Sequence, residues 1–192
     1  AHEQTQRAPS RSQAKEFTVD EIRALEAFLF NGDEPEEYRV LTGAVLLLVS
    51  VRGRFADLEN ALEVVHDEET LTIKMRKTKS SHMDKSRLPI AMVGPRYLFG
   101  AGCWYTEWCR IREEADILEE GWPLMPSLVS EEWAPSPIGN NDFNTALQKV
   151  CQKLNFVDVP ERSSHSCKAT LLTLASVKGS VSYTHLPLPT NR

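Results

Sequence analysis

Three short stretches of this sequence hold side chains that suit phosphate chemistry. Arg54 follows a long apolar run and Asp57 comes three residues later, and His165 and Lys168 stand at the same spacing further along the chain. A guanidinium group offers a planar fork of donors that matches two phosphate oxygens, an ammonium group adds a point charge, and an imidazole transfers protons near neutral pH. These residue types indicate phosphate binding with proton transfer beside it.

The third stretch is a concentration of cations in the middle of the chain. The net charge of −5 argues against nucleic acid only if charge is counted globally, because binding depends on where the cations lie. Acids gather at 33–37 and 116–120, whereas the segment 74–87 has only one, Asp84. Its six cations are either candidate DNA-binding residues or a merely solvated hairpin face: Lys74, Arg76, Lys77, Lys79, Lys85 and Arg87.

Helical patterns precede the first stretch. Thr18 and Glu21 form a capping-box pattern before apolar residues at helical spacing, so a helix is predicted to begin just after Thr18 and to end at Asn31-Gly32. A second helix is predicted from Pro35 through the apolar run 40–51. This run has no polar face, which indicates that the helix is almost wholly buried.

The pattern changes to alternation after a short amphipathic stretch at 55–62. Three groups of apolar residues are predicted to form short strands, and the last two flank the basic segment. The cations are therefore expected at the tip of a hairpin. The apolar residues of the three strands are Val64 and Val65, then Leu71, Ile73 and Met75, then Leu88, Ile90 and Met92.

Helical spacing returns in the second half of the chain. Residues 98–120 are predicted to form one helix, with its tryptophans in the core. Prolines between 123 and 137 predict an irregular connection, which is followed by an amphipathic helix over 143–154. A last helix is predicted from Ser164 to Gly179. The order of elements predicts a mainly α protein with a small antiparallel β-sheet, an α+β fold.

The composition is that of an ordinary globular domain. The chain has 192 residues, of which 41% are hydrophobic and 26% charged, enough for a core that needs neither disulfides nor metal. No apolar run is long enough for a bilayer and no secretory signal opens the chain, so no membrane contact is expected. The four cysteines are expected to be reduced core thiols, and no metal or other cofactor is expected, because no ligand cluster has the required spacing.

The order and spacing of the three stretches resemble those of the tyrosine recombinases, the phage-integrase family. The run Ser50-Val51-Arg52-Gly53-Arg54-Phe55-Ala56-Asp57-Leu58 resembles the family's first box, in which a buried helix ends in Arg followed three residues later by Glu or Asp. Lys77-Thr78, before Arg87-Leu88-Pro89-Ile90, is similar to the hairpin lysine and the strand after it, with Lys79 as second choice for the lysine. His165-Ser166-Cys167-Lys168 resembles the second box, HxxR.

This resemblance covers residues 17–179 and implies the catalytic-domain fold of the family. In that family a tyrosine hydroxyl attacks a DNA phosphodiester, forms a 3′-phosphotyrosyl link and frees a 5′-hydroxyl, without metal or nucleotide energy. It implies that Arg54 clamps the phosphate and that Asp57 holds the site together. Lys77 would protonate the leaving 5′-oxygen, and His165 would transfer a proton or bind the phosphate. The implied partners are DNA and further recombinase protomers in a homo-oligomer, inside the cell, in the nucleus of a eukaryote or otherwise the cytoplasm or nucleoid.

Two departures from the family pattern affect activity. Lys168 stands where the family usually has a second Arg, so charge is kept but a second guanidinium fork is lost. This HxxK form is more similar to recombinase-like proteins of eukaryotic mobile elements than to bacterial integrases. The other departure concerns the nucleophile, because the family's third box and its tyrosine should follow Gly179 after another helix.

The ends of the chain are expected to lie outside the catalytic domain. Residues 1–16 are interpreted as a flexible arm or interdomain linker, and 17–180 as a truncated catalytic domain. Val181 to Leu186 equals a translation of CTGTCTCTTATACACATCT, a transposon end used in sequencing adapters, so 181–192 is interpreted as adapter-derived rather than native. Tyr183 lies in this tail and is not expected to be the nucleophile, which leaves none in the chain.

Two alternatives to a recombinase remain open from the sequence. The chain could be a DNA-binding or interaction module that kept the recombinase fold without its chemistry, for which Lys168 is the best support. It could also be a helical interaction domain unrelated to DNA, which the acidic net charge would favour. Salt-sensitive DNA binding would exclude the last alternative.

Overall fold

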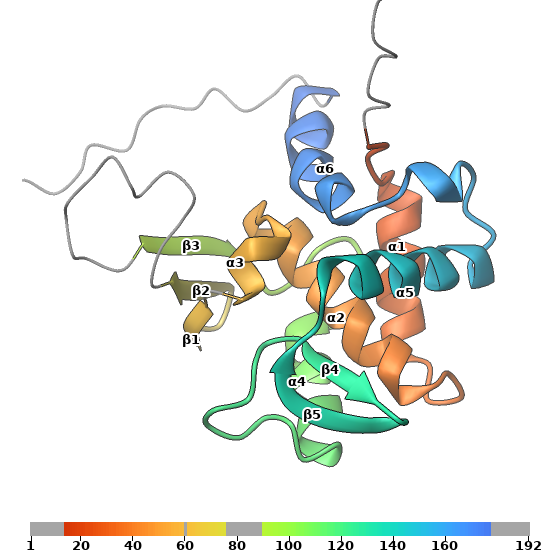
Figure 1. Ribbon diagram of the computed structural model, residues 1–192. Helices are drawn as coiled ribbons and strands as arrows, with labels where there is room; N and C mark the ends of the chain where they lie inside the picture. Colours follow the sequence, from red (N-terminus) through yellow and green to blue (C-terminus); the bar gives the residue numbers. More distant parts are fainter. Residues whose placement is uncertain (1–13, 60, 76–89, 178–192) are drawn as a thin grey trace, which may run out of the picture.

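One buried helix, α2 (Glu36–Val51), runs through the middle of the structure, and helices α1, α4, α5 and α6 and strand β3 pack against it (Figure 1). The structure is a computed structural model that describes residues 14–59, 61–75 and 90–177. The other elements are α1 (Val19–Phe30), α3 (Phe55–Glu59), β1 (Ala61–His66), β2 (Thr70–Met75), β3 (Ile90–Pro95), α4 (Trp104–Glu114), β4 (Pro126–Val129), β5 (Glu132–Pro137), α5 (Asn140–Lys153), a 3₁₀ turn η1 (Val159–Glu161) and α6 (Ser164–Val177).

Helix α1 begins where its capping box predicts. The Thr18 hydroxyl accepts a hydrogen bond from the Glu21 N–H at 3.2 Å, and the Glu21 carboxylate accepts one from the Thr18 N–H at 2.7 Å. Two N–H groups that the helix itself leaves without acceptors are thereby satisfied. The first predicted helix is confirmed, and its apolar face packs on α2.

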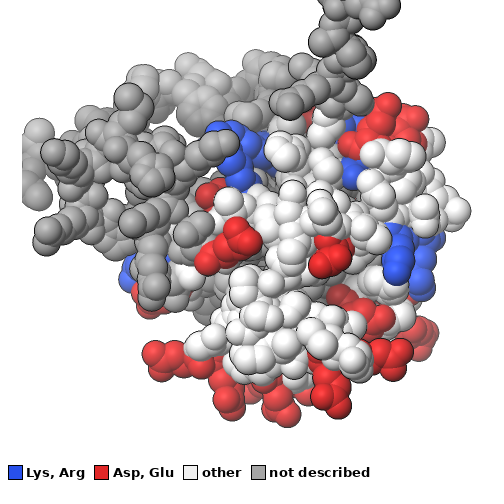
Figure 2. Space-filling view, in the orientation of Figure 1, with Lys and Arg blue, Asp and Glu red and all other residues white. Residues whose placement is uncertain are grey.

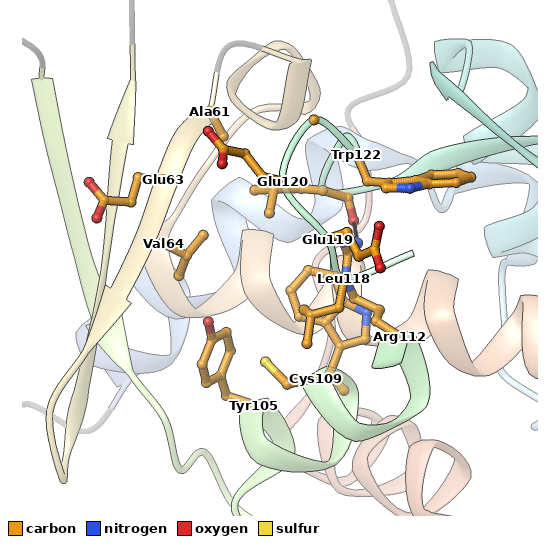
Figure 3. A pocket seen from close by; sticks show the side chains of 13 residues that line it. Ala61, Glu63, Val64, Tyr105, Cys109, Arg112, Leu118, Glu119, Glu120 and Trp122 are labelled. Atoms are coloured by element: carbon orange, nitrogen blue, oxygen red, sulfur yellow. Dashed lines mark hydrogen bonds between the residues drawn. The ribbon is translucent and has the colours of Figure 1, made fainter. Parts of the chain in front are cut away.

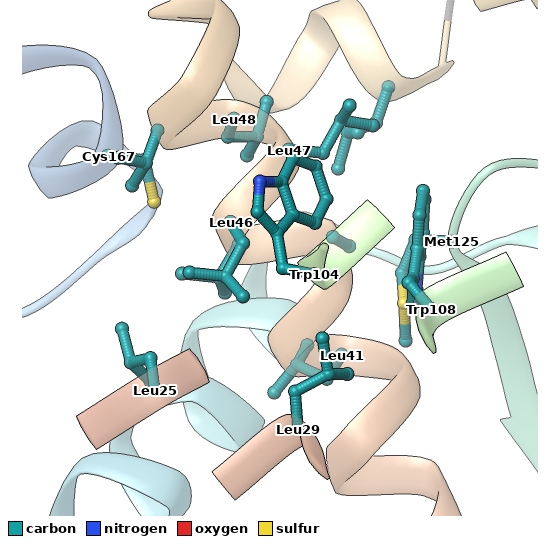
Figure 4. Close-up of a cluster of buried hydrophobic side chains, with 14 of the residues drawn as sticks. Leu25, Leu29, Leu41, Leu46, Leu47, Leu48, Trp104, Trp108, Met125 and Cys167 are labelled. Atoms are coloured by element: carbon teal, nitrogen blue, oxygen red, sulfur yellow. The ribbon is translucent and has the colours of Figure 1, made fainter. Parts of the chain in front are cut away.

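The core is built around α2, whose residues from Arg39 to Val51 are all buried, as the lack of a polar face predicts. Trp104 and Trp108 of α4 pack against this helix (Figure 4) and are 0% and 1% exposed. The Trp108 indole Nε1 donates to the Val40 carbonyl at 2.9 Å. Gly43 allows this contact, because a Cβ there would lie 1.9 Å from Trp108 Cδ1. The tryptophans are therefore core residues, as predicted.

The three predicted strands form one antiparallel sheet in the order β1-β2-β3. Leu71, Ile73 and Met75 alternate along β2 and are buried, so the period of two correctly identifies the core face. The segment 76–89, which joins β2 to β3 and contains most of the predicted basic tip, lies outside the described residues.

The prediction of one helix over 98–120 is wrong at both ends, because α4 covers only Trp104–Glu114. The buried Glu26 carboxylate accepts hydrogen bonds from the N–H groups of Phe99 at 3.0 Å and Gly100 at 2.6 Å, which holds that segment as a loop. At the other end Asp116 adopts a positive φ of 55°, which ends the helical path.

The prediction of an irregular connection over 123–137 is also wrong, because this segment contains the hairpin β4–β5. Proline cannot donate a hydrogen bond, but a two-stranded sheet leaves one edge of each strand without a partner. Pro126 and Pro137 face each other at the open end of this hairpin, where the register is irregular. The amphipathic stretch predicted at 55–62 is shorter than expected, because α3 ends at Glu59 and β1 begins at Ala61.

The two C-terminal helices, α5 and α6, occur where the apolar periodicity predicts them. All four cysteines are free, with Cys151 and Cys167 buried and Cys103 and Cys109 partly buried. Within the described ranges, no helix combines the length and apolarity that crossing a membrane requires. The segments predicted as an N-terminal arm (1–13 of it) and as an adapter-derived tail (181–192) lie outside the described residues.

Candidate functional site

A pocket of about 290 Å³ opens where α3, the start of α5 and the start of α6 meet. Three of the residues predicted for phosphate chemistry, Arg54, His165 and Lys168, lie around it although more than half of the chain separates the first from the others. The full lining is Arg54, Phe55, Ala56, Glu59, Asn140, Ser164, His165 and Lys168.

Arg54 reaches the pocket because the chain turns sharply after α2. Arg52 adopts the left-handed conformation with φ 54°, and its N–H caps the end of the helix. The Asp57 carboxylate then accepts the Arg54 N–H at 2.6 Å, and the Asp57 N–H donates to the Arg54 carbonyl at 2.8 Å. Asp57 therefore orients the main chain at Arg54, which leaves the exposed Arg54 side chain at the pocket.

The start of α6 is held by hydrogen bonds from α5. The Ser164 N–H donates to Asn144 Oδ1 at 2.8 Å, and the Ser164 hydroxyl donates to Asn140 Oδ1 at 3.2 Å. Ser164 is buried, so these bonds satisfy polar groups that water does not reach. They fix the turn of helix from which exposed His165 and half-buried Lys168 project toward the pocket.

A buried arginine, Arg162, ties the segment before α6 to the N-terminal side of the domain. Its guanidinium pairs with Glu21 at 2.5 Å, donates to the carbonyls of Lys15 and Glu16, and lies 5.0 Å from the centre of the Phe17 ring. The Arg162 side chain is fully buried. The connection that leads into the His165 helix is therefore anchored only a few residues before the pocket.

The acidic side chains are not spread evenly over the surface. In Figure 2 they are densest along the lower edge, over α4 and the β4–β5 hairpin, with others next to α3, and cations appear beside α3 and α6 and at the edge near α5. Among the described residues that line the pocket, Arg54 and Lys168 are accompanied by one acid, Glu59, and Asp57 lies beside Arg54 behind the lining. An anion is therefore attracted to this part of an acidic protein.

A second pocket of about 230 Å³ lies between β1 and α4 (Figure 3), and its lining argues against a phosphate. Glu63, Glu119 and Glu120 line it. Arg112 is the one cation among the described residues that line it, and its guanidinium already donates to main-chain carbonyls, including that of Ile117 at 2.8 Å. Burial also lowers the pKa of Arg112 to about 10. The pocket at Arg54 is thus the better anion site of the two.

Several predicted residues are not in this pocket. Lys74 lies on β2, where its ammonium pairs with Glu63 at 2.8 Å on the surface. Such exposed pairs are weak, so Lys74 stays accessible to another anion. The structure does not describe five further residues predicted for catalysis or DNA binding: Arg76, Lys77, Lys79, Lys85 and Arg87.

The pocket is also lined by residues that the sequence did not predict as part of a site: Phe55, Glu59, Asn140 and Ser164. Their place depends on how α5 meets α6 and α3, which no local pattern encodes. Within the described ranges, no group of three His, Cys, Asp or Glu side chains is placed to hold a metal ion.

Comparison with known proteins shows a likeness at the level of structure. No family model matches the chain, and no curated protein matches its sequence. Among solved structures, the chain is similar to XerH site-specific recombinase bound to palindromic difH substrate in a post-cleavage complex, with a TM-score of 0.57 and 11% identity over 86% of this chain and 43% of that chain. It is also similar to XerH bound to difH in a pre-cleavage complex, with a TM-score of 0.58 and 11% identity over 87% of this chain and 44% of that chain.

This likeness shows the fold. The described residues form an α+β structure like the catalytic domain of a tyrosine recombinase, as predicted. The chain spans less than half of the length of the XerH chains that it matches.

Proposed function

We propose that this chain is the DNA-phosphate-binding catalytic domain of a recombinase-like protein that exchanges DNA strands through a phosphotyrosyl intermediate. The observation that carries the proposal is the meeting of Arg54, His165 and Lys168 around one pocket. They come from two distant stretches of the sequence, and the residue types of each stretch resemble one of the two conserved boxes of the tyrosine recombinases. The similarity of fold to XerH recombinase is consistent with the proposal.

The pocket residues suit the charge that develops during phosphoryl transfer. A pentavalent phosphorane carries extra negative charge on its nonbridging oxygens, and preorganised cations stabilise that charge more than the ground state. Arg54 would contact two oxygens, Lys168 would add one point charge, and His165 would transfer a proton or donate to the phosphate. Lys77 is proposed as the acid for the leaving 5′-oxygen, on the segment outside the described residues.

Salt-dependent DNA binding tests the phosphate site. Each phosphate that the protein no longer neutralises lowers the slope of log affinity against log salt by about 0.9, so Arg54→Ala and Lys168→Ala should each reduce it by about that amount. Lys153→Ala is the matched control, because Lys153 is an exposed cation that pairs with Glu34 at 2.7 Å away from the pocket. Equal slopes for all three variants and the unchanged chain would place the DNA surface elsewhere.

The segment 74–87 is proposed as a second DNA-binding surface. A variant in which four of its cations are replaced together should also show a smaller slope of log affinity against log salt, by about 0.9 for each phosphate that these cations neutralise. The four cations are Lys74, Arg76, Lys77 and Lys79. An unchanged slope would limit DNA binding to the pocket.

Among the described residues, no tyrosine lines the pocket. We propose that this chain binds DNA but does not cleave it, and that Tyr183, which lies outside the described residues, is not a nucleophile. Incubation with nicked suicide substrates should give no covalent protein-DNA adduct. An adduct that disappears in Tyr183→Phe would overturn this part of the proposal.

The second candidate is a DNA-binding module that has lost strand exchange, and Lys168 is the observation that favours it. An ammonium group cannot make the paired contacts of a guanidinium. Lys168→Arg separates the two candidates when it is introduced into a form of the protein that carries a nucleophilic tyrosine. Cleavage by that form without the substitution supports the enzyme, whereas cleavage only with the substitution, or in neither form, supports the module.

A further inference from the structure

The side-chain amide of Asn140, the first residue of α5, is oriented by a chain of hydrogen bonds that starts from a main-chain donor. The Ser164 N–H can only donate, so the atom of Asn144 that it contacts at 2.8 Å is the oxygen Oδ1. The other end of that amide, Asn144 Nδ2, is therefore a donor, and it lies 3.5 Å from Asn140. The atom it meets must be the acceptor, Asn140 Oδ1.

The same Asn140 oxygen also accepts the Ser164 hydroxyl at 3.2 Å. With Oδ1 occupied by two donors, the remaining capacity of the Asn140 side chain is its Nδ2 group, which carries two N–H bonds. Among the described residues, the Asn140 side chain makes hydrogen bonds only through Oδ1. Asn140 is exposed and lines the pocket with Arg54, His165 and Lys168. The amide is thus fixed on one side and has its donors available on the other.

We propose that Asn140 is a phosphate-contacting residue of this site, donating from Nδ2 to a nonbridging oxygen of the DNA phosphate. The inference rests on the proposed function, because it assigns a further contact to the same pocket. A neutral amide already oriented by Ser164 and Asn144 needs little reordering on binding. It supplies a directed donor beside Lys168, whose ammonium contributes a point charge without a planar fork.

The variant that isolates the donor is Asn140→Asp. It keeps an oxygen for Ser164 and Asn144 but replaces the two N–H donors with a second acceptor. Asn141→Asp is the matched control, because Asn141 is the next residue of α5, is exposed and does not line the pocket. Both variants add the same charge to the same turn of helix, so the difference between them measures the effect at the pocket.

Affinity for a short fluorescein-labelled DNA duplex should fall more than tenfold further in Asn140→Asp than in Asn141→Asp. Asn140→Ala should lose about tenfold, since a hydrogen bond to a charged group contributes about 1.5 kcal/mol or more. Because the removed donor is neutral, Asn140→Ala should leave the salt slope unchanged, unlike Arg54→Ala. Equal affinities of the two Asp variants would overturn the inference.

A titration with inorganic phosphate separates this inference from the proposed function. In ¹⁵N-labelled protein, the Asn140 side-chain NH₂ and the His165 main-chain amide should shift with one apparent dissociation constant. If His165 responds and the Asn140 NH₂ does not, the phosphate site stands and Asn140 only supports α6, which overturns the inference. If neither group responds, the phosphate site itself is wrong.

Discussion

Replacing Arg162 with methionine should destabilise the whole domain although the residue is outside the pocket. The substitution leaves the Glu21 carboxylate, 12% exposed, without its partner at 2.5 Å, and the carbonyls of Lys15 and Glu16 without this donor. Breaking a buried ion pair from one side costs about 3–5 kcal/mol. We take the low end, about 3 kcal/mol, since the Thr18 N–H still donates to Glu21 and Arg162 Nε has no partner among the described residues.

Urea unfolding followed by circular dichroism measures this free energy. For a chain of this size the loss corresponds to a fall in Tm on the order of 10 °C. Arg23→Met is the control, because Arg23 forms an exposed pair with Asp20 at 3.0 Å, and such pairs contribute less than about 1 kcal/mol. Unfolding of Arg162→Met and Arg23→Met at the same urea concentration would refute this role of Arg162.

Three further predictions concern the core and its titratable groups. Gly43→Ala should cost about 1–3 kcal/mol or more in unfolding free energy, because its Cβ would overlap Trp108 at 1.9 Å; a neutral effect would contradict the packing. Burial raises the pKa of Glu26 above its ordinary 4.5, so the folded state binds its proton more tightly than the unfolded state, and this contribution to stability is lost as pH rises from 4.5 through the raised pKa. Glu26→Gln should remove that part of the pH dependence in urea titrations, and an unchanged profile would contradict it. Burial raises the pKa of Cys167 to about 12, whereas for partly exposed Cys103 the effect of burial is outweighed by hydrogen bonds from Thr106 and the charge of Arg96, which lower its pKa. Iodoacetamide followed by mass spectrometry should therefore modify Cys103 well before Cys167 in the native protein, and the reverse order would be incompatible with this structure.

The parts of the fold that the sequence predicts are those determined by neighbouring residues. The capping box at Thr18, the unbroken apolar run of α2 and the alternation in β2 are local signals, and each element appears where its signal lies. The predicted start of α4 is too early because a distant residue, Glu26, holds the preceding segment as a loop. Only the folded chain brings that carboxylate there.

The candidate site likewise contains residues that a local sequence signal predicts and residues that only the folded structure brings to the pocket. The residue types and spacing of Arg54, His165 and Lys168 resemble a known family, and the structure brings these three side chains to one pocket. Asn140 carries no such signal, since its place depends on hydrogen bonds between α5 and α6. The β4–β5 hairpin escapes prediction because its prolines resemble a loop until the pairing partner is known.

The measurement that tests the central claim most directly is the position of a phosphate mimic in a crystal of this protein. Tungstate has the shape and charge of a phosphate dianion, and its anomalous scattering locates it without ambiguity. We expect one tungstate ion in the pocket between α3, α5 and α6, within hydrogen-bond distance of Arg54 and either His165 or Lys168. Tungstate bound at other surfaces, with this pocket empty, would contradict the assignment of a phosphate site.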